Sequence, residues 1–153
     1  MLSISHAVTG AFIAVKVGNP ALSIPLILLS HYLEDAVPHW DVGTGMSKGV
    51  KSPLLALRHE MIDLALAGIL VLVFFPPAFP LHPLTFISSP AIWGAFLGLL
   101  SDFLEAPRNF LRFEPRWLTP LNRFHSSFHH SIPRPLDGLA PQILLLTTLW
   151  FLR

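Results

Sequence analysis

Histidine and aspartate recur in this sequence at spacings that place them on one face of a helix. His31 and Asp35 are four residues apart, and so are His125 and His129. Residues four apart in an α-helix lie one above the other on the same face. Imidazole nitrogens and carboxylate oxygens together form the ligand set of Zn²⁺, Mn²⁺ or non-haem iron. The two pairs therefore predict a divalent metal site held by two helices.

Further histidines and acids are expected at the same site from other segments. His39 and Asp41 follow Pro38 directly, just beyond the helix that carries the first pair, and His6 lies near the start of the chain. Taken alone, a histidine–aspartate pair is most often a hydrogen bond at a helix end, and a single histidine is most often a satisfied core residue. The convergence of several segments favours the metal site over these structural explanations.

Two carboxylate pairs at a spacing of three residues add candidates for catalysis. They are Glu60 with Asp63 and Asp102 with Glu105. Such groups serve as metal ligands, as acceptors for the outer N–H of a ligand histidine, or as the general base for a metal-bound water. We expect Glu60 or Asp63 as the base and Asp102 as a bridging or orienting group. The alternative is that Asp63 and Asp102 pair with nearby arginines and anchor helices.

Nearly all ionisable residues fall at one predicted end of the molecule. All nine acidic residues map there, and so do seven of the eight histidines, leaving only His82 at the other end. Eight of the ten basic residues lie in the two connections at this end, namely Lys48, Lys51, Arg58, Arg108, Arg112, Arg116, Arg123 and Arg134. Ionisable side chains within a membrane helix are costly, so their accumulation indicates function.

The composition is typical of a membrane protein. Apolar residues make up 52% of the 153 residues and charged residues only 12%, against about 25% in a typical soluble domain. The mean hydropathy is +0.59. Residues 64–101 contain no Asp, Glu, Lys or Arg, and one bilayer crossing takes about 20 apolar residues. This run predicts a membrane hairpin broken by a proline-rich turn at 76–83; the alternative is a very apolar soluble helical domain.

Prolines mark where the helices begin. Asn19, Ser52, Ser89 and Thr119 each precede a proline, so that a capping residue stands before the residue preferred at the first helical position. The expected helices cover 4–16, 20–37, 53–75, 90–106, a short amphipathic segment at 120–131, and 138–152 with Asp137 as its N-cap. The predicted fold class is all-α, an integral-membrane bundle of about five membrane helices plus a short interfacial helix, in one membrane-embedded domain of residues 1–153.

Net charge and cysteine content exclude several classes of function. Ten basic and nine acidic residues give a net charge of +1, which provides no electrostatic basis for nucleic-acid binding. The lack of cysteine excludes disulfides, thiolate metal sites and a cysteine nucleophile. The N-terminus does not have the pattern of a signal peptide. Because basic loops stay in the cytoplasm, we expect a prokaryotic inner-membrane protein whose metal-site end is cytoplasmic.

Three segments resemble motifs of a known family. Residues 5–10 read SHAVTG, residues 31–41 read HYLEDAVPHWD, and residues 125–131 read HSSFHHS. They are similar, in the same order, to motifs of small prokaryotic integral-membrane metal-dependent hydrolases, which are distantly similar to zinc-dependent phospholipase C. This resemblance implies an all-helical enzyme with a divalent metal, Zn²⁺ first and Mn²⁺ or Fe²⁺ as alternatives. The residues that it implies as metal ligands are His6, His31, Asp35, His39, Asp41, His125 and His129.

Three functions follow from these patterns as hypotheses. The first is a membrane-embedded metal-dependent hydrolase that acts on a lipid or a phosphoester at the cytoplasmic leaflet, with membrane lipid as its surroundings. The second is a non-catalytic membrane protein, which carries protons or metal ions or docks a partner. The third is a di-iron oxidase, because His125, His129 and His130 resemble one histidine box of membrane desaturases. That class needs several such boxes, and this chain has one.

Overall fold

The structure is a computed structural model that describes residues 1–46, 49–77 and 82–153. Its helices are α1 (Ser3–Val17), α2 (Pro20–Ala36), α3 (Pro53–Phe74), α4 (Pro83–Ile87), α5 (Pro90–Gly98), α6 (Leu100–Leu111), α7 (Thr119–Phe128) and α8 (Pro135–Leu152). Within the described residues there is no strand beyond one isolated bridge between His39 and Ser131. The prediction of an all-α fold is confirmed.

Prolines stand at the starts of the helices, as the sequence predicted, but two of the four predicted capping side chains do not cap: Ser89 makes no cap hydrogen bond, and Thr119 lies inside α7, whose N-cap residue is Leu118. The side chain of Asn19 accepts a hydrogen bond from the N–H of Ala21 at 2.9 Å at the start of α2. At the start of α3, Ser52 accepts one from the N–H of Leu55 at 3.2 Å. These side chains satisfy backbone donors that the helix itself leaves unpaired.

The single helix predicted over 90–106 is wrong, because two helices occupy this region. α5 ends at Gly98, and α6 begins at Leu100 and continues past Pro107 to Leu111. At the break, the carbonyl of Gly98 accepts a hydrogen bond from Nδ1 of His31 at 2.8 Å. A carbonyl that bonds a side chain on another helix is consistent with an interruption of the helix at this point.

The ends of the last two helices also differ from the prediction. α7 ends at Phe128 and not at 131, because the backbone that follows pairs with the segment after α2. α8 begins at Pro135 with Arg134 as its N-cap residue, so Asp137 lies inside the first turn, where the helix dipole favours a negative charge. α4 was not predicted. Lys48 and residues 78–81 of the predicted proline-rich turn lie outside the described residues.

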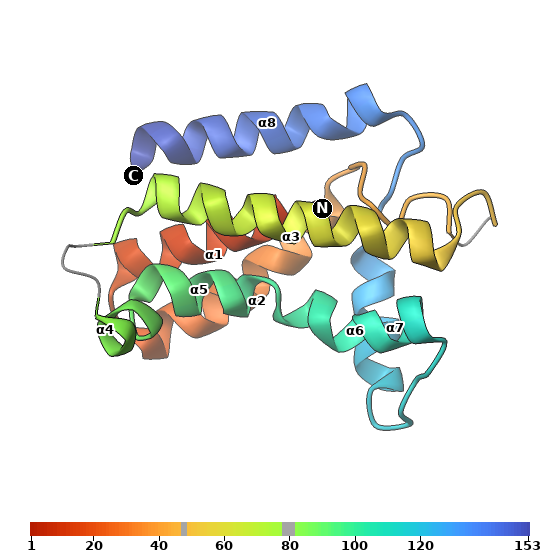
Figure 1. The fold of residues 1–153 in the computed structure, drawn as a ribbon, viewed down its shortest axis with the longest axis horizontal. Helices are drawn as coiled ribbons and strands as arrows, with labels where there is room; N and C mark the ends of the chain where they lie inside the picture. The colour runs from red at the N-terminus through yellow and green to blue at the C-terminus, as the bar shows by residue number, and fades with distance from the viewer. Residues whose placement is uncertain (47–48, 78–81) are drawn as a thin grey trace.

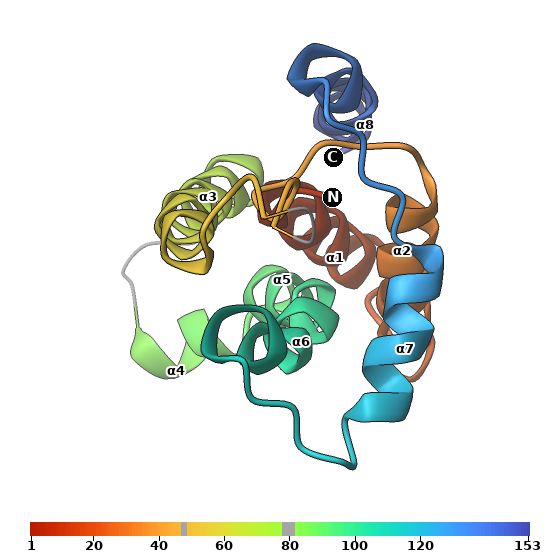
Figure 2. The ribbon, with the colours of Figure 1, turned by 90° about the vertical axis from the view of Figure 1, so that its right-hand side faces the viewer.

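α1 is the central helix and packs against α2, α3, α5 and α8 (Figure 2). Its contact with α5 requires glycine on both sides. A Cβ atom on Gly10 would lie 2.3 Å from the carbonyl oxygen of Gly94, and one on Gly98 would lie 2.2 Å from that of His6. Small residues allow helix backbones to approach this closely, which is common in membrane bundles.

Large apolar side chains cover much of the outer surface. Leu22 is 59% exposed on α2, Ile69 is 56% exposed on α3, and Phe151 is 80% exposed on α8. Of the helices in the described ranges, however, only α8 is long and apolar enough to cross a membrane by length and composition. α5 has nine residues, and the first half of α3 carries Arg58, Glu60 and Asp63. The prediction of about five membrane helices is therefore not supported.

The predicted polar end of the bundle is formed where α2, α6 and α7 meet (Figure 1). α7 lies across the ends of α2 and α6 and is turned away from the direction of the other long helices. The connection from α2 to α3 passes over the same end. α2 and the much later helices α6 and α7 therefore bring their side chains to one place.

Candidate metal centre

Asp35 stands at the middle of the candidate site. It lies in the last turn of α2 and is fully buried, with 0% of its surface exposed. Its two carboxylate oxygens face different histidines, since Oδ2 lies 2.8 Å from Nε2 of His125 and Oδ1 lies 3.8 Å from Nε2 of His39. One side chain thereby joins two groups of potential ligands.

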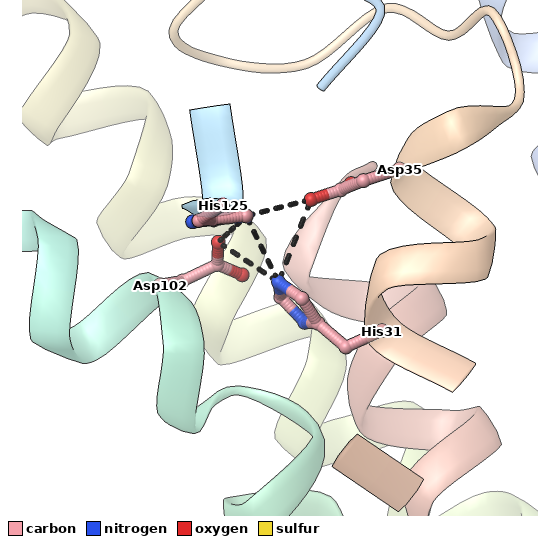
Figure 3. Close-up of side chains that lie close together, drawn as sticks. All are labelled: His31, Asp35, Asp102 and His125. Carbon is pink, nitrogen blue, oxygen red and sulfur yellow. Dashed lines mark hydrogen bonds and ion pairs between the residues drawn. The ribbon is translucent and has the colours of Figure 1, made fainter. Parts of the chain in front are cut away.

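The first group consists of His31, Asp35, Asp102 and His125, which converge from α2, α6 and α7 (Figure 3). Nε2 of His31 lies 3.1 Å from Nε2 of His125 and 3.5 Å from Oδ2 of Asp35. Oδ1 of Asp102 lies 3.7 Å from the His31 nitrogen and 4.0 Å from the His125 nitrogen. The predicted approach of Asp102 to the histidines is present in the structure.

The second group consists of Asp35, His39 and His129. Nε2 of His39 lies 3.1 Å from Nε2 of His129. Oδ2 of Asp41 is close to both, at 3.4 Å from the His39 nitrogen and 3.3 Å from the His129 nitrogen. The His129 side chain is 33% exposed, so this group lies nearer to the surface than the first.

His125 and His129 belong to different groups, although their spacing suggested one shared helix face. His129 follows the end of α7 and has extended backbone, with φ −76° and ψ 111°. The chain after it runs beside His39, whose N–H donates to the carbonyl of His130 at 3.0 Å and whose carbonyl accepts from Ile132 at 2.7 Å. The N–H of His130 donates to the carbonyl of Asp35 at 3.0 Å. These backbone bonds hold the second group together.

Outer contacts orient the imidazole rings so that their Nε2 atoms face inward. Nδ1 of His31 donates to the carbonyl of Gly98, and Nδ1 of His39 donates to the carbonyl of Val37, both at 2.8 Å. Nδ1 of His125 lies 3.0 Å from Oε2 of Glu105. Histidines that bind metals commonly have such a carbonyl or carboxylate partner on the other ring nitrogen. The arrangement is therefore typical of a metal site.

The hydrogen bonds within the first group mark the place where a cation would bind. A carbonyl oxygen only accepts hydrogen bonds, so the proton of neutral His31 sits on Nδ1 and its Nε2 carries a lone pair. Nε2 of His125 lies 3.1 Å from this nitrogen and 2.8 Å from Oδ2 of Asp35. Both of these neighbours are acceptors, so in the absence of a metal a proton on Nε2 of His125 satisfies them. A divalent ion could replace that proton, because all three atoms can serve as its ligands.

The separations fit a divalent ion. Ligand atoms at 2.0–2.1 Å from a tetrahedral metal lie roughly 3.3–3.4 Å from one another. In the first group, five of the six separations run from 2.8 to 4.0 Å. In the second, Oδ2 of Asp41 is buried without a hydrogen-bond partner among the described residues. These buried histidines and aspartates could hold a metal ion.

The imidazoles around Asp41 keep it ionised. Burial alone would raise the pKa of this carboxyl group, but the neighbouring His129 and His39 outweigh burial and hold the pKa well below its ordinary range. An ionised carboxylate is the form that binds a metal.

His6 lies beside Asp35 but outside both groups. Its ring stacks on His31 with the centroids 4.0 Å apart, and its Nε2 lies 3.2 Å from Oδ1 of Asp35. The amino group of Met1 contacts the same aspartate oxygen. Nδ1 of His6 lies 2.8 Å from Oε2 of Glu34, which is buried. The structure thus brings His6 to the site as a neighbour of the ligand groups.

The carboxylates predicted as bases lie at the start of α1. Asp63 accepts hydrogen bonds from the backbone N–H of Ser3 at 2.7 Å and of Ile4 at 3.4 Å. Glu60 accepts one from the hydroxyl of Ser3 at 2.6 Å. Acidic groups are favourable at a helix N-terminus, so Asp63 serves to anchor α1 against α3.

A cleft of about 1010 Å³ adjoins the two groups. Asp41, Asp102 and His129 line it from the site, and Glu60 lines it from α3. Its remaining lining includes two arginines and a set of apolar side chains, which are Arg108, Arg112, Leu57, Met61, Leu64, Phe103 and Phe110. The cleft therefore offers both charged and apolar surface next to the candidate metal centre.

Two residues of the site were not singled out from the sequence. Glu34 precedes Asp35 and could not be distinguished from a surface acid by spacing. Gln142 is a polar residue within the apolar helix α8, and this contrast is the sequence feature that could have identified it. Both are buried, at 8% and 2% exposed.

No family model, no curated protein and no solved structure shows a significant match to this chain.

Proposed function

We propose that this protein is a membrane-embedded, metal-dependent hydrolase that acts on an amphiphilic ester or phosphoester. The observation that carries the proposal is the arrangement around Asp35, whose two oxygens face two histidine pairs beside a cleft. A centre of two divalent ions, Zn²⁺ first, suits these ligands. The resemblance of the three sequence motifs to membrane metal-dependent hydrolases supports the same reaction class.

The membrane location rests on the surface of the molecule. Large apolar side chains are exposed on α2, α3 and α8, among them Leu29, Leu66 and Phe151. Monomeric soluble proteins rarely expose apolar patches of more than a few hundred Å². We place the metal-centre end at the cytoplasmic face because most lysines and arginines lie in the connections at that end.

The chain offers groups for each part of such a reaction. A divalent ion supplies a Lewis acid that polarises a phosphoryl or acyl oxygen and makes water a nucleophile near neutral pH. Glu60 lines the cleft and is the candidate base. Arg108 and Arg112 can hold an anionic group, and Arg108 already has Glu105 and Ser126 as partners. The Leu57, Met61 and Phe103 side chains provide a wall for an apolar chain.

Elemental analysis of the full chain purified in detergent tests the metal. We expect about two divalent ions per chain, with one lost in His125→Ala and one lost in His129→Ala. The same preparations are then assayed on phosphoester and carboxylester substrates in mixed micelles, where Glu60→Gln should lose turnover but keep its metal. Wild-type protein without bound metal, with unaltered histidine variants, would refute the proposal.

A carrier function remains the competing hypothesis, and flux measurements distinguish it. Zn²⁺ or proton flux into proteoliposomes, with bound metal but no turnover of any ester, would replace the hydrolase by a carrier. The described residues of the opposite end offer few ionisable groups for a continuous path, with His82 as the histidine there. This distribution favours the hydrolase.

A further inference from the structure

Gln142 is a buried polar residue in a helix whose other side chains are mostly exposed. The buried residues of α8 are Gly138, Gln142 and Leu149. A buried amide is costly unless all of its hydrogen-bonding capacity is used. The contacts of this amide therefore show what α8 holds in place.

The amide of Gln142 makes four hydrogen bonds to three parts of the chain. Its Oε1 accepts from the backbone N–H of Leu2 at 2.8 Å and from the hydroxyl of Ser5 at 3.2 Å. Its Nε2 donates to the carbonyls of Trp40 and Gly138, both at 2.8 Å. The N–H of Leu2 only donates and the carbonyl of Trp40 only accepts, so the orientation of the amide is fixed.

Trp40 is the residue between His39 and Asp41, and α8 holds its backbone on both sides. Its carbonyl accepts from Gln142, and its N–H donates to the carbonyl of Gly138 at 3.2 Å. A Cβ atom at position 138 would lie 2.2 Å from the Trp40 nitrogen, so this approach requires glycine. The first turns of α8 thus fix the backbone that presents His39 and Asp41.

We infer that Gln142 is a positioning residue for the second metal group, through its hydrogen bond to Trp40. This inference rests on the proposed metal centre. It concerns the second group alone, because the outer contacts of His31 and His125 come from Gly98 and Glu105 on other helices. Gln142 itself touches no ligand atom, so it acts through the placement of His39 and Asp41.

Two substitutions distinguish the hydrogen bonds of the amide oxygen from those of the amide nitrogen. Gln142→Glu keeps an oxygen for Leu2 and Ser5 but places a second oxygen against the carbonyl of Trp40. Gln142→Leu removes both sides. Thr148→Val is the matched control on α8, because the Thr148 hydroxyl bonds only the carbonyl of Leu144 in its own helix.

The experiment is a Zn²⁺ titration of each full-length variant in detergent, in competition with a chromophoric chelator. We expect one of the two ions to bind more weakly in Gln142→Glu, by up to the roughly 10- to 100-fold that is typical for the loss of a direct outer partner of a metal ligand. The other ion keeps its wild-type affinity, and Thr148→Val keeps both. Circular dichroism confirms that Gln142→Glu is folded, in case Gln142→Leu is not.

The same substitution in a His129→Ala protein shows which of the two metal groups Gln142 affects. In His129→Ala, which retains only the first group, adding Gln142→Glu should leave the affinity of the remaining ion unchanged. Two ions bound at wild-type affinity in both Gln142 variants would overturn the positioning role and leave the proposed function standing. Equal weakening of both ions would also overturn it. Wild-type protein that binds no ion would refute the proposed function itself.

Discussion

Nδ1 of His125 lies 3.0 Å from Oε2 of Glu105, on the opposite side of the ring from Asp35. Glu105 also contacts Arg108, which lines the cleft. One carboxylate therefore connects a candidate metal ligand with the charged surface where an anionic substrate would bind. Glu105 therefore affects the first group alone, whereas Asp35 belongs to both groups.

Glu105→Gln should weaken the ion in the first group by roughly 10- to 100-fold, because the outer carboxylate orients the imidazole and raises its basicity. Chelator competition with Zn²⁺ measures the change. Asp137→Asn is the control, since Asp137 is exposed and pairs with Arg134 on the surface. Unchanged affinity in Glu105→Gln would show that the contact with His125 does not support metal binding.

Asp35→Asn should abolish binding of both ions, because Asp35 is the residue that the two groups share. Asp102→Asn should weaken the ion of the first group alone. Metal content by elemental analysis after gel filtration gives both results. Retention of one full equivalent by Asp35→Asn would contradict a shared carboxylate.

Metal affinity should fall as the pH drops, because a ligand imidazole must be neutral and protons compete with the metal for it. The depressed pKa of Asp41 means that its carboxylate stays ionised as the pH falls from 8 to 5. Histidine protonation therefore sets the loss of metal. Zn²⁺ titrations between pH 5 and 8 measure it, and an affinity that falls for neither ion across this range would contradict the predicted competition by protons.

Gly98→Ala should destabilise the fold by more than the roughly 1–3 kcal/mol typical of overpacking, since the added methyl group would meet backbone atoms of α1. Gly68→Ala is the matched control. A Cβ atom at Gly68 meets nothing within 4 Å, and alanine is favoured over glycine inside a helix by up to about 1 kcal/mol. The midpoint temperature of thermal unfolding in detergent should fall for Gly98→Ala and should rise or stay unchanged for Gly68→Ala.

The chain should remain in the membrane pellet when expressing cells are extracted with alkaline carbonate, and detergent should release it. The apolar surface of α2, α3 and α8 is the physical reason. A known peripheral membrane protein in the same preparation is the control. Release by carbonate would refute the embedded location.

The structure brings together histidines and aspartates that the sequence predicted at one site, but it divides them into two groups. Helical spacing correctly brought His31 and Asp35 together, because both lie within α2. It could not show that α7 ends before His129, since this end depends on backbone pairing with His39, nearly a hundred residues earlier in the chain. Proline and capping residues located the helix starts because these signals are local.

The break between α5 and α6 was not predicted because it, too, involves a contact between distant parts of the chain. Gly98 was the one local signal of a helix end there, and no proline accompanies it; the partner of its carbonyl is a histidine on α2. The number of membrane-spanning helices was overestimated, because the hydropathy of residues 64–101 does not show that this run divides into α3, α4 and α5. Tertiary contacts decide both features.

Gly98 serves two neighbours at once. Its lack of a side chain allows the backbone of α1 to approach, and its carbonyl accepts a hydrogen bond from Nδ1–H of His31. The tightness of a helix crossing and the tautomer of a buried imidazole thus depend on the same residue. A side chain at this position would push α5 away from α1, and the carbonyl that orients the imidazole would move with it.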